Sequence, residues 1–272
     1  MLFRSLAVLG NPIVHSRSPE IHGLFGEQAG IELSYERILV PDGEFAAIAG
    51  EFFARPEAVG VNVTVPCKAD AWRFAGVTSD NAEKAQAVNT LRLQADGTLS
   101  GHNTDGAGLV ADLINNLGWQ LQDQRILVLG AGGAVRGVMA NLLAQQPAKL
   151  HLWNRTRSRA EALVSAFGDK AQALPVDQLE TAYDLVINGT SASLSEQQIA
   201  LPASIIGDGS CCYDMVYGAE PTLFNRWCLA QARCRVADGL GMLVEQAAVA
   251  FEIWFGVRPE TRPALAHVRK TL

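Results

Sequence analysis

From Ile126 to Arg136 the chain reads ILVLGAGGAVR, an apolar run that leads into a glycine-rich turn and then into a predicted helix. Gly130 permits the tight turn, and the two glycines after it let the backbone approach a pyrophosphate closely. Free N–H groups and the helix dipole favour an anion there. The spacing is not a strict G-x-G-x-x-G, but a strand before and a helix after it are the required context. The alternative is a strand–helix turn without a ligand. The predicted dinucleotide contacts are Gly130, Ala131, Gly132, Gly133 and Ala134.

The next predicted strand ends at Trp153 and is followed by Asn154-Arg155-Thr156-Arg157-Ser158-Arg159. An NAD site usually carries Asp or Glu here to bind the ribose 2′-hydroxyl, whereas this segment has three arginines and no acid. Guanidinium groups suit a 2′-phosphate, and cations at a helix N-terminus otherwise oppose the helix dipole. We therefore predict a preference for NADP. The contacts expected near the phosphate are Asn154, Arg155, Thr156 and Arg159.

Segments with strand and helix patterns alternate along the whole chain, which favours an α/β fold with mostly parallel sheets. An Asp96-Gly97 pair between two short apolar runs predicts a hairpin, and Ser18-Pro19 predicts an N-cap followed by a helix. The expected strands are 6–10, 35–40, 59–65, 126–129, 150–153, 184–188 and 212–215. The expected helices begin near residues 18 and 66 and otherwise span 44–53, 107–117, 134–143, 160–167, 240–255 and 263–272.

Composition excludes several classes of protein. The 272 residues carry a formal net charge of −6, with 49% hydrophobic and 18% charged residues, so we expect a globular chain with neither nucleic acid nor membrane as partner. Gly10, Asn11 and Pro12 interrupt the first apolar stretch, which we expect to be a buried strand rather than a signal peptide. Five cysteines without a C-x-x-C pair predict reduced thiols, a cytoplasmic location and no metal site.

Four polar clusters lie at the predicted ends of strands or turns in the first 106 residues. Ligands of open α/β sheets bind beyond the carboxyl ends of the strands, and hydroxyls, amides, a lysine and an aspartate would suit a small polyhydroxylated acid. Ordinary cap and turn chemistry is the alternative for each cluster taken singly. The clusters span residues 11–19 (NPIVHSRSP), 62–68 (NVTVPCK), 87–90 (AVNT) and 103–106 (NTDG).

Together with the glycine loop, these clusters closely resemble the motifs of the shikimate dehydrogenase family. Further motifs of that family are Tyr213-Asp214-Met215 and Asp238-Gly239-Leu240-Gly241-Met242, and all of them follow in family order along nearly the whole chain. The resemblance implies NADP-dependent interconversion of shikimate and 3-dehydroshikimate in aromatic amino-acid biosynthesis. It also implies two domains with the active site in the cleft between them. The implied domains are a substrate-binding domain, 1–105 plus 239–272, and a Rossmann-type NADP-binding domain, 106–238.

The same resemblance implies roles for individual residues. Ser16 and Ser18 would hold the substrate carboxylate, and Asn62, Thr64, Asn89 and Gln246 would bind ring hydroxyls. Lys68 and Asp105 would be the catalytic pair and would also touch the substrate. Such a pair is needed because a proton must leave the substrate hydroxyl as hydride leaves the carbon that carries it. The sequence leaves open which of the two carries the proton, and a solvated lysine and a helix N-cap are the alternatives. The implied cofactor contacts extend to Thr190, Met215 and Gly239.

Three residues depart from the family pattern close to these sites. Cys67 stands where Phe is common, Gln86 where Gly is usual, and His102 where Asp usually precedes Asn103. One interpretation is neutral drift around the site, and the other is an altered substrate range or pH optimum.

Other functions stay open at this point. A related enzyme could act on quinate or on an amino analogue of shikimate, and a relative could bind ligand without catalysis. The pattern also leaves a monomer and a homodimer as alternatives.

Overall fold

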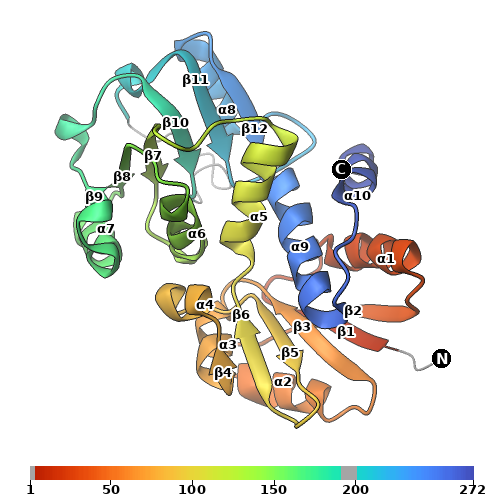
Figure 1. Ribbon diagram of the computed structural model, residues 1–272. Coiled ribbons are helices and arrows are strands. Elements are labelled where there is room, and N and C mark those ends of the chain that lie inside the picture. The colour runs from red at the N-terminus through yellow and green to blue at the C-terminus, as the bar shows by residue number, and fades with distance from the viewer. Residues whose placement is uncertain (1–3, 191–200) are drawn as a thin grey trace. The chain divides into compact units, whose positions relative to one another are not determined.

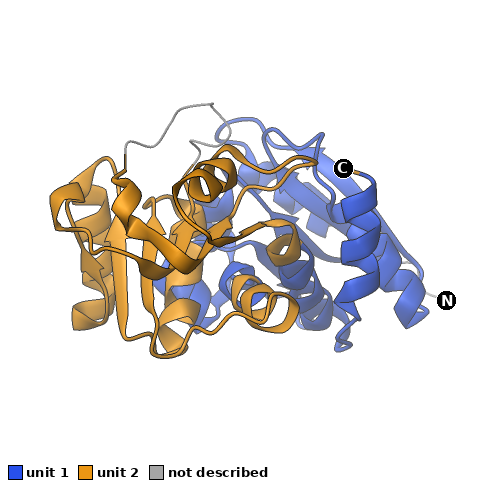
Figure 2. Ribbon diagram, turned by 90° about the horizontal axis from the view of Figure 1, so that it is seen from above, with its two compact units in different colours: residues 1–108, 244–271 blue, residues 109–243, 272 orange. Residues whose placement is uncertain are grey.

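The computed structural model describes residues 4–190 and 201–272. The chain divides into two compact units, Met1–Gly108 with Val244–Thr271, and Leu109–Leu243 with Leu272 (Figure 2). It leaves the first unit inside helix α5 (Asp105–Ala111) and returns inside α9 (Leu240–Phe255), as Figure 1 allows the reader to follow. Each unit is a mostly parallel sheet with helices, so the predicted α/β fold is confirmed.

The sheet of the first unit has the strand order β2-β1-β3-β5-β6-β4. Neighbouring strands are parallel except for β3 with β5 and β5 with β6, which are antiparallel. The strands are β1 (Arg4–Gly10), β2 (Leu33–Leu39), β3 (Ala58–Val63), β4 (Val77–Thr78), β5 (Thr90–Leu93) and β6 (Leu99–His102). The helices besides α9 are α1 (Ser18–Ala29), α2 (Phe45–Phe53), α3 (Lys68–Phe74), α4 (Asp80–Ala85) and α10 (Thr261–Lys270).

Strand β1 is buried on both faces, as expected of a central parallel strand covered by helices. Ala7 and Leu9 pack into the cluster that contains residues of α2, whereas Leu6 packs with Trp254 of α9 on the other face. Gly60 of β3 is required beneath that tryptophan, because a Cβ there would lie 2.2 Å from the indole Nε1.

The second unit has six parallel strands in the order β12-β11-β10-β7-β8-β9. This is the order of two βαβαβ halves that meet at β7 and β10, the arrangement of dinucleotide-binding sheets. The strands are β7 (Arg125–Leu129), β8 (Lys149–Trp153), β9 (Gln172–Ala173), β10 (Tyr183–Asn188), β11 (Ile206–Asp214) and β12 (Arg235–Asp238). The helices are α6 (Gly133–Ala144), α7 (Arg157–Val164) and α8 (Leu223–Gln231), with a π-helical turn at Asp112–Asn116 and 3₁₀ turns at Ser165–Lys170, Val176–Gln178 and Ala203–Ile205.

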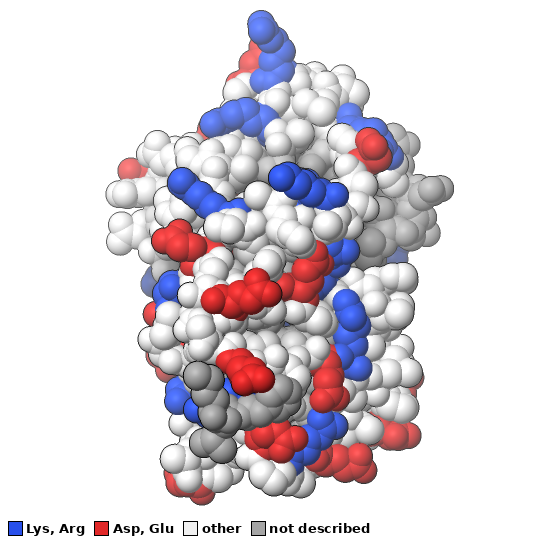
Figure 3. All heavy atoms as spheres, turned by 90° about the vertical axis from the view of Figure 1, so that its right-hand side faces the viewer, with Lys and Arg blue, Asp and Glu red and all other residues white. Residues whose placement is uncertain are grey.

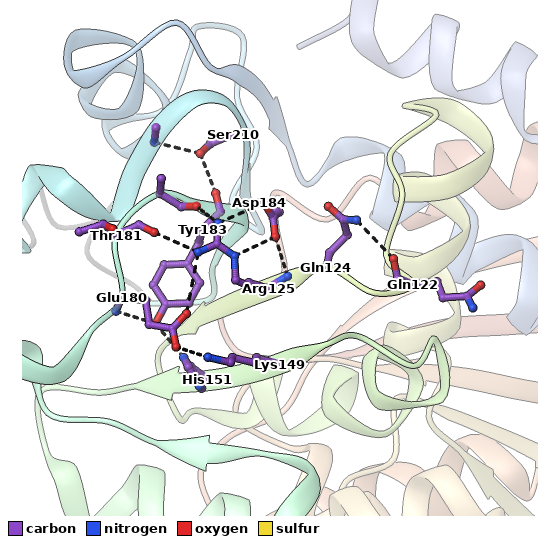
Figure 4. Close-up of polar contacts among 12 residues, drawn as sticks. Gln122, Gln124, Arg125, Lys149, His151, Glu180, Thr181, Tyr183, Asp184 and Ser210 are labelled. Atoms are coloured by element: carbon purple, nitrogen blue, oxygen red, sulfur yellow. Dashed lines mark hydrogen bonds and ion pairs between the residues drawn. The ribbon is translucent and has the colours of Figure 1, made fainter.

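Strand β7 is also buried on both faces. Ile126 and Val128 face one apolar cluster, and Leu127 and Leu129 face the other. At its amino end, Arg125 donates from its backbone N (2.8 Å) and Nε (3.2 Å) to Asp184 of β10. Figure 4 shows this contact beside the ion pair of Lys149 with Glu180 (2.5 Å). These pairs link β7, β8 and β10 at the edge opposite the glycine loop.

The structure corrects several predicted boundaries. The N-cap of α1 is Arg17 rather than Ser18, and α3 begins at Lys68 rather than at Pro66. The β5–β6 hairpin is present, but its loop runs over residues 94–98 and is longer than a two-residue turn. Helix α7 begins earlier than predicted and gives way at Ser165 to a 3₁₀ turn that contains Gly168 in a non-helical conformation. The sequence prediction missed the short strands β4, β9 and β12.

Acidic and basic side chains are interspersed on the face drawn in Figure 3. Exposed ion pairs such as Arg55 with Glu36 and Arg73 with Asp70 contribute about 0–1 kcal/mol each to stability. The fold therefore depends mainly on the buried clusters described above. Among the described residues, no helix is long and apolar enough to cross a membrane.

Gln86 ends helix α4 in the left-handed conformation, with φ 49° and ψ 40°. This explains why the family pattern has glycine at the position: a side chain with a Cβ is disfavoured in that conformation by about 1–2 kcal/mol. Glutamine at this position therefore strains the backbone and lowers stability, directly before the Ala87–Thr90 cluster.

We predict that Gln86→Gly is more stable than Gln86→Ala by about 1 kcal/mol, because both variants lose the carboxamide and only glycine adopts the left-handed conformation without strain. The free energies of unfolding from urea titrations give the comparison. An alanine variant as stable as the glycine variant would contradict the left-handed conformation at this position.

Candidate functional site

Lys68 and Asp105 form an ion pair at the start of two helices. Lys68 is the first residue of α3 and Asp105 the first residue of α5, and Nζ lies 2.5 Å from Oδ2. The lysine side chain is 18% exposed and the aspartate side chain 9%. Asp105 is therefore not the residue before its helix, and its carboxylate contacts side chains from other elements.

Asn89 joins this pair to α9. Its Nδ2 lies 2.8 Å from Asp105 Oδ1 and 3.3 Å from Gln246 Oε1, and its Oδ1 accepts from the backbone N–H of Thr104 at 2.9 Å. The Thr104 hydroxyl also lies 3.2 Å from Gln246 Oε1. The carboxamide of Asn89 thus holds together residues from the β5 start, the α5 start and α9.

Backbone contacts fix the positions of these side chains. The Val88 N–H donates to the Lys68 carbonyl at 2.9 Å, and the Asn89 N–H donates to the His102 carbonyl at 3.0 Å. The side chain of Asn103 connects two segments of the site. Its Nδ2 donates to the Ala87 carbonyl at 3.0 Å, and its Oδ1 accepts a hydrogen bond from the Asp105 N–H at 3.2 Å. The cluster 87–90 is therefore tied to both catalytic candidates.

Asn62 lies at the end of β3 and is buried. Its Nδ2 contacts the Asn89 carbonyl (3.2 Å) and the Thr90 hydroxyl (3.1 Å). Its Oδ1 accepts from the Tyr35 hydroxyl at 2.6 Å and lies 3.1 Å from His22 Nε2. Asn62 is hence connected to the Asn89 network on one side and to α1 and β2 on the other.

Ser16 and Ser18 lie at the start of α1 and contact each other. The Ser16 hydroxyl lies 3.2 Å from the Ser18 hydroxyl, and Arg37 donates to the Ser16 carbonyl at 2.7 Å and 2.9 Å. Thr64 follows β3, and within the described part of the chain its hydroxyl makes no side-chain hydrogen bond. Its methyl group packs against Gly10, where a Cβ would lie 2.4 Å away.

The pair has the chemistry of a proton-transfer site. Both Asp105 oxygens are engaged, one by Lys68 and one by Asn89. An ammonium group has three N–H donors, so Lys68 keeps donors for a ligand while Asp105 holds it in place. A ligand hydroxyl beside Nζ would meet a positioned proton donor and acceptor.

Two of the departures from the family pattern border this pair. Cys67 is buried, and burial together with the charge of Asp70 raises the pKa of its thiol, which disfavours a reactive thiolate. Burial, and then the charge of Arg92, lower the pKa of His102. Its imidazole is accordingly neutral at pH 7 and adds no charge to the site.

The glycine loop lies in the second unit between β7 and α6. Gly130 has a φ of 107°, which favours glycine, and a Cβ there would lie 3.1 Å from the Gly189 carbonyl oxygen after β10. A Cβ on Gly132 or Gly133 would meet nothing within 4 Å. The loop backbone is therefore accessible at the carboxyl ends of β7 and β10, where dinucleotides bind such sheets.

The loops after β10 and β11 are held by buried polar side chains. The Thr190 hydroxyl donates to Asn188 Oδ1 at 2.8 Å, and Asn188 Nδ2 donates to Asp214 Oδ1 at 3.0 Å. Gly239 lies against Met215, since a Cβ at 239 would lie 2.2 Å from the Met215 carbonyl oxygen. Thr190, Met215 and Gly239 are thus all held on the side of the sheet that carries the glycine loop.

The arginines in the segment after β8 differ in whether they form an ion pair. Arg157 forms an ion pair with Glu161 at 2.7 Å. Arg155 and Arg159 are exposed, and no described residue forms an ion pair with either of them. Asn154 shapes the turn by donating to the Thr156 carbonyl at 2.7 Å. Two guanidinium groups are consequently available for a phosphate, so the residues fit NADP.

Several residues of these networks were not singled out in the sequence. His22 lies inside α1 and Tyr35 inside β2, and neither belongs to a motif or a polar cluster. Gly189 follows β10, and a glycine directly after a buried strand was the available indication. Thr104 was quoted only as part of its cluster.

Comparison with known proteins gives the same assignment for each part of the chain. Residues 8–91 match the shikimate dehydrogenase substrate binding domain, residues 112–199 match shikimate / quinate 5-dehydrogenase, and residues 239–269 match the shikimate 5′-dehydrogenase C-terminal domain. The second match ends inside the segment that is not described structurally.

Similar proteins extend over the full length. The chain is 51% identical to shikimate dehydrogenase (NADP(+)) of Alkalilimnicola ehrlichii, with 97% of each chain covered. Among solved structures, an Ael1 enzyme from Pseudomonas putida has a TM-score of 0.92 at 39% identity, with 97% of each chain covered. Shikimate 5-dehydrogenase from Thermus thermophilus, in complex with NADP(H) and shikimate, has a TM-score of 0.88 at 34% identity, covering 99% of this chain and 100% of that one. With its motifs, its two sheets and these similarities, the chain belongs to the shikimate dehydrogenase family.

Proposed function

We propose that this protein catalyses the NADP-dependent interconversion of shikimate and 3-dehydroshikimate, a step of aromatic amino-acid biosynthesis. The observation that carries the proposal is the Lys68–Asp105 pair inside the hydrogen-bond network of Asn89 and Gln246. Such a pair needs a ligand hydroxyl to act on, and shikimate supplies one beside further hydroxyls that amides can bind.

The first unit supplies the substrate contacts in this proposal. Ser16 and Ser18 present hydroxyl donors for the carboxylate, and Gln246 and Asn89 face the same network as the catalytic pair. Asn62 binds a ring hydroxyl by sharing its amide with its protein partners, and Thr64 offers a hydroxyl that is unengaged by the described residues. Substrate orientation is then set before reaction, which lowers the entropic part of the barrier.

The proton moves through Lys68 and Asp105. NADP, when bound, supplies the hydride acceptor for the oxidation of shikimate. Lys68 lies at the reacting hydroxyl and, with Asp105, takes its proton as the carbonyl forms; in the reverse direction the pair returns the proton. Because the two groups are coupled at 2.5 Å, we assign the proton to the pair rather than to one residue.

The second unit supplies the cofactor contacts. The loop at residues 130–134 binds the pyrophosphate through its N–H groups, and Arg155 and Arg159 bind the 2′-phosphate. Asn154 and Thr156 shape that turn. Thr190, Met215 and Gly239 complete the cofactor site from the loops after β10, β11 and β12.

We place the enzyme in the cytoplasm as a monomer or a homodimer. All five cysteines are free, and four of them are buried, which suits a reducing compartment.

Initial rates of nicotinamide reduction over a grid of shikimate and quinate, each with NADP and with NAD, test the function. We expect fast turnover with shikimate and NADP. Turnover only with quinate would show that quinate, not shikimate, is the substrate. A folded protein that binds NADP but oxidises neither shikimate nor quinate would overturn the proposal.

On the same grid, Lys68→Ala should lower kcat by about 10²–10⁴-fold, the usual contribution of a positioned acid–base group. Circular dichroism should stay close to wild type, since Lys68 is the first residue of α3 and no hydrogen bond within that helix depends on its side chain. A Lys68→Ala enzyme with near-normal kcat would remove Lys68 from the mechanism.

Arg155→Asp should raise the KM for NADP by about 10–100-fold, the loss expected for a charge-assisted hydrogen bond to phosphate, with little change in the KM for NAD. Arg157→Ala is the matched control, because that arginine is already paired with Glu161. If both variants kept the wild-type ratio of the two KM values, Arg155 would have no part in cofactor selection.

A further inference from the structure

The buried hydroxyl of Tyr35 holds the carboxamide of Asn62, one of the proposed contacts of the substrate ring. The Tyr35 hydroxyl donates to Asn62 Oδ1 at 2.6 Å. Both residues belong to the first unit.

The orientation of the Asn62 carboxamide is fixed by the Asn89 carbonyl. A carbonyl oxygen can only accept, so the group 3.2 Å from it must be Nδ2 rather than Oδ1. Oδ1 consequently faces Tyr35 and His22, and both of them must donate. The carboxamide then makes two donor and two acceptor contacts, and turning it over would set Oδ1 against the Asn89 carbonyl oxygen, which cannot donate.

His22 supports this arrangement from the buried side. Its Nε2 lies 3.1 Å from Asn62 Oδ1, and its ring stacks on Tyr35 with 4.7 Å between centroids and 7° between planes. Burial lowers the pKa of His22 to about 3, against a smaller opposing effect of Asn62, so the ring is neutral. A neutral ring that donates from Nε2 leaves Nδ1 as an acceptor, and Nδ1 has no partner among the described residues.

We propose that Tyr35, supported by His22, is a positioning residue for substrate binding, because it holds the asparagine that binds a ring hydroxyl. This inference rests on the proposed function. Tyr35 does not touch the reacting atoms in it. Its hydroxyl and the His22 N–H fix the Asn62 carboxamide in one orientation, in which the ligand meets it.

The test is Tyr35→Phe, which removes the hydroxyl and keeps the ring that stacks on His22. We expect the KM for shikimate to rise about tenfold, the factor for roughly 1.4 kcal/mol, with kcat within about twofold and the KM for NADP unchanged. Tyr183→Phe is the matched control: Tyr183 is a buried tyrosine that contacts His151 at 2.8 Å in the second unit (Figure 4). It should leave both KM values unchanged.

Two further measurements separate positioning from general destabilisation. In a double-mutant cycle, Asn62→Ala should raise the shikimate KM less in the Tyr35→Phe background than in wild type, because Tyr35 acts through Asn62. His22→Gln keeps an N–H donor for Asn62 and should show a lower shikimate KM than His22→Leu, although both lose the stacking ring.

The outcomes distinguish this inference from the proposed function. A wild-type enzyme that does not oxidise shikimate would end the proposed function itself. If the wild-type enzyme has normal activity, the role of Tyr35 would be overturned by a Tyr35→Phe variant with the wild-type shikimate KM, or by additive effects of Tyr35→Phe and Asn62→Ala.

Discussion

The structure depends on the burial of β1 and β7 on both faces. Apolar residues alternate between two clusters along each of these strands, so the strands offer no face to a ligand. Polar side chains can then be placed only where the strands end. The glycine loop follows β7 directly, the segments that carry Ser16 and Lys68 follow β1 and β3, and Asn62 is the last residue but one of β3.

Asn89 is the centre of the polar site because this one residue joins three elements. Its carboxamide contacts Thr104 and Asp105 at the start of α5 and Gln246 of α9, and its backbone N–H donates to His102 at the end of β6. Buried polar groups are costly unless they are hydrogen-bonded, so this network specifies one arrangement of the catalytic pair. Through Asn62, the same network extends to the Tyr35 hydroxyl of β2.

Much of the architecture could be predicted because its causes are local. The strand–glycine–helix pattern at residues 126–136 predicts a βα unit, and the two-faced apolar strands predict parallel sheets. Boundaries were less accurate where capping deviated from residue preference, as at Arg17, or where a kink at Gly168 ended a helix early. Strands of two residues, such as β4 and β9, carry too little pattern to be predicted.

By itself, the sequence determined the longer strands and most of the helices, the dinucleotide loop, the arginines that suit a 2′-phosphate, and, through resemblance, the identity of the catalytic candidates. These follow from periodicity, glycine placement and charge, which act within a few residues along the chain. Only the tertiary structure decided that Lys68 contacts Asp105 and that Tyr35 and His22 hold Asn62. It also showed that Arg157 pairs with Glu161, whereas no described residue forms an ion pair with Arg155. The contacts of Lys68 and of Asn62 join residues far apart in sequence, and their hydrogen-bond directions depend on which donors and acceptors the fold brings into reach.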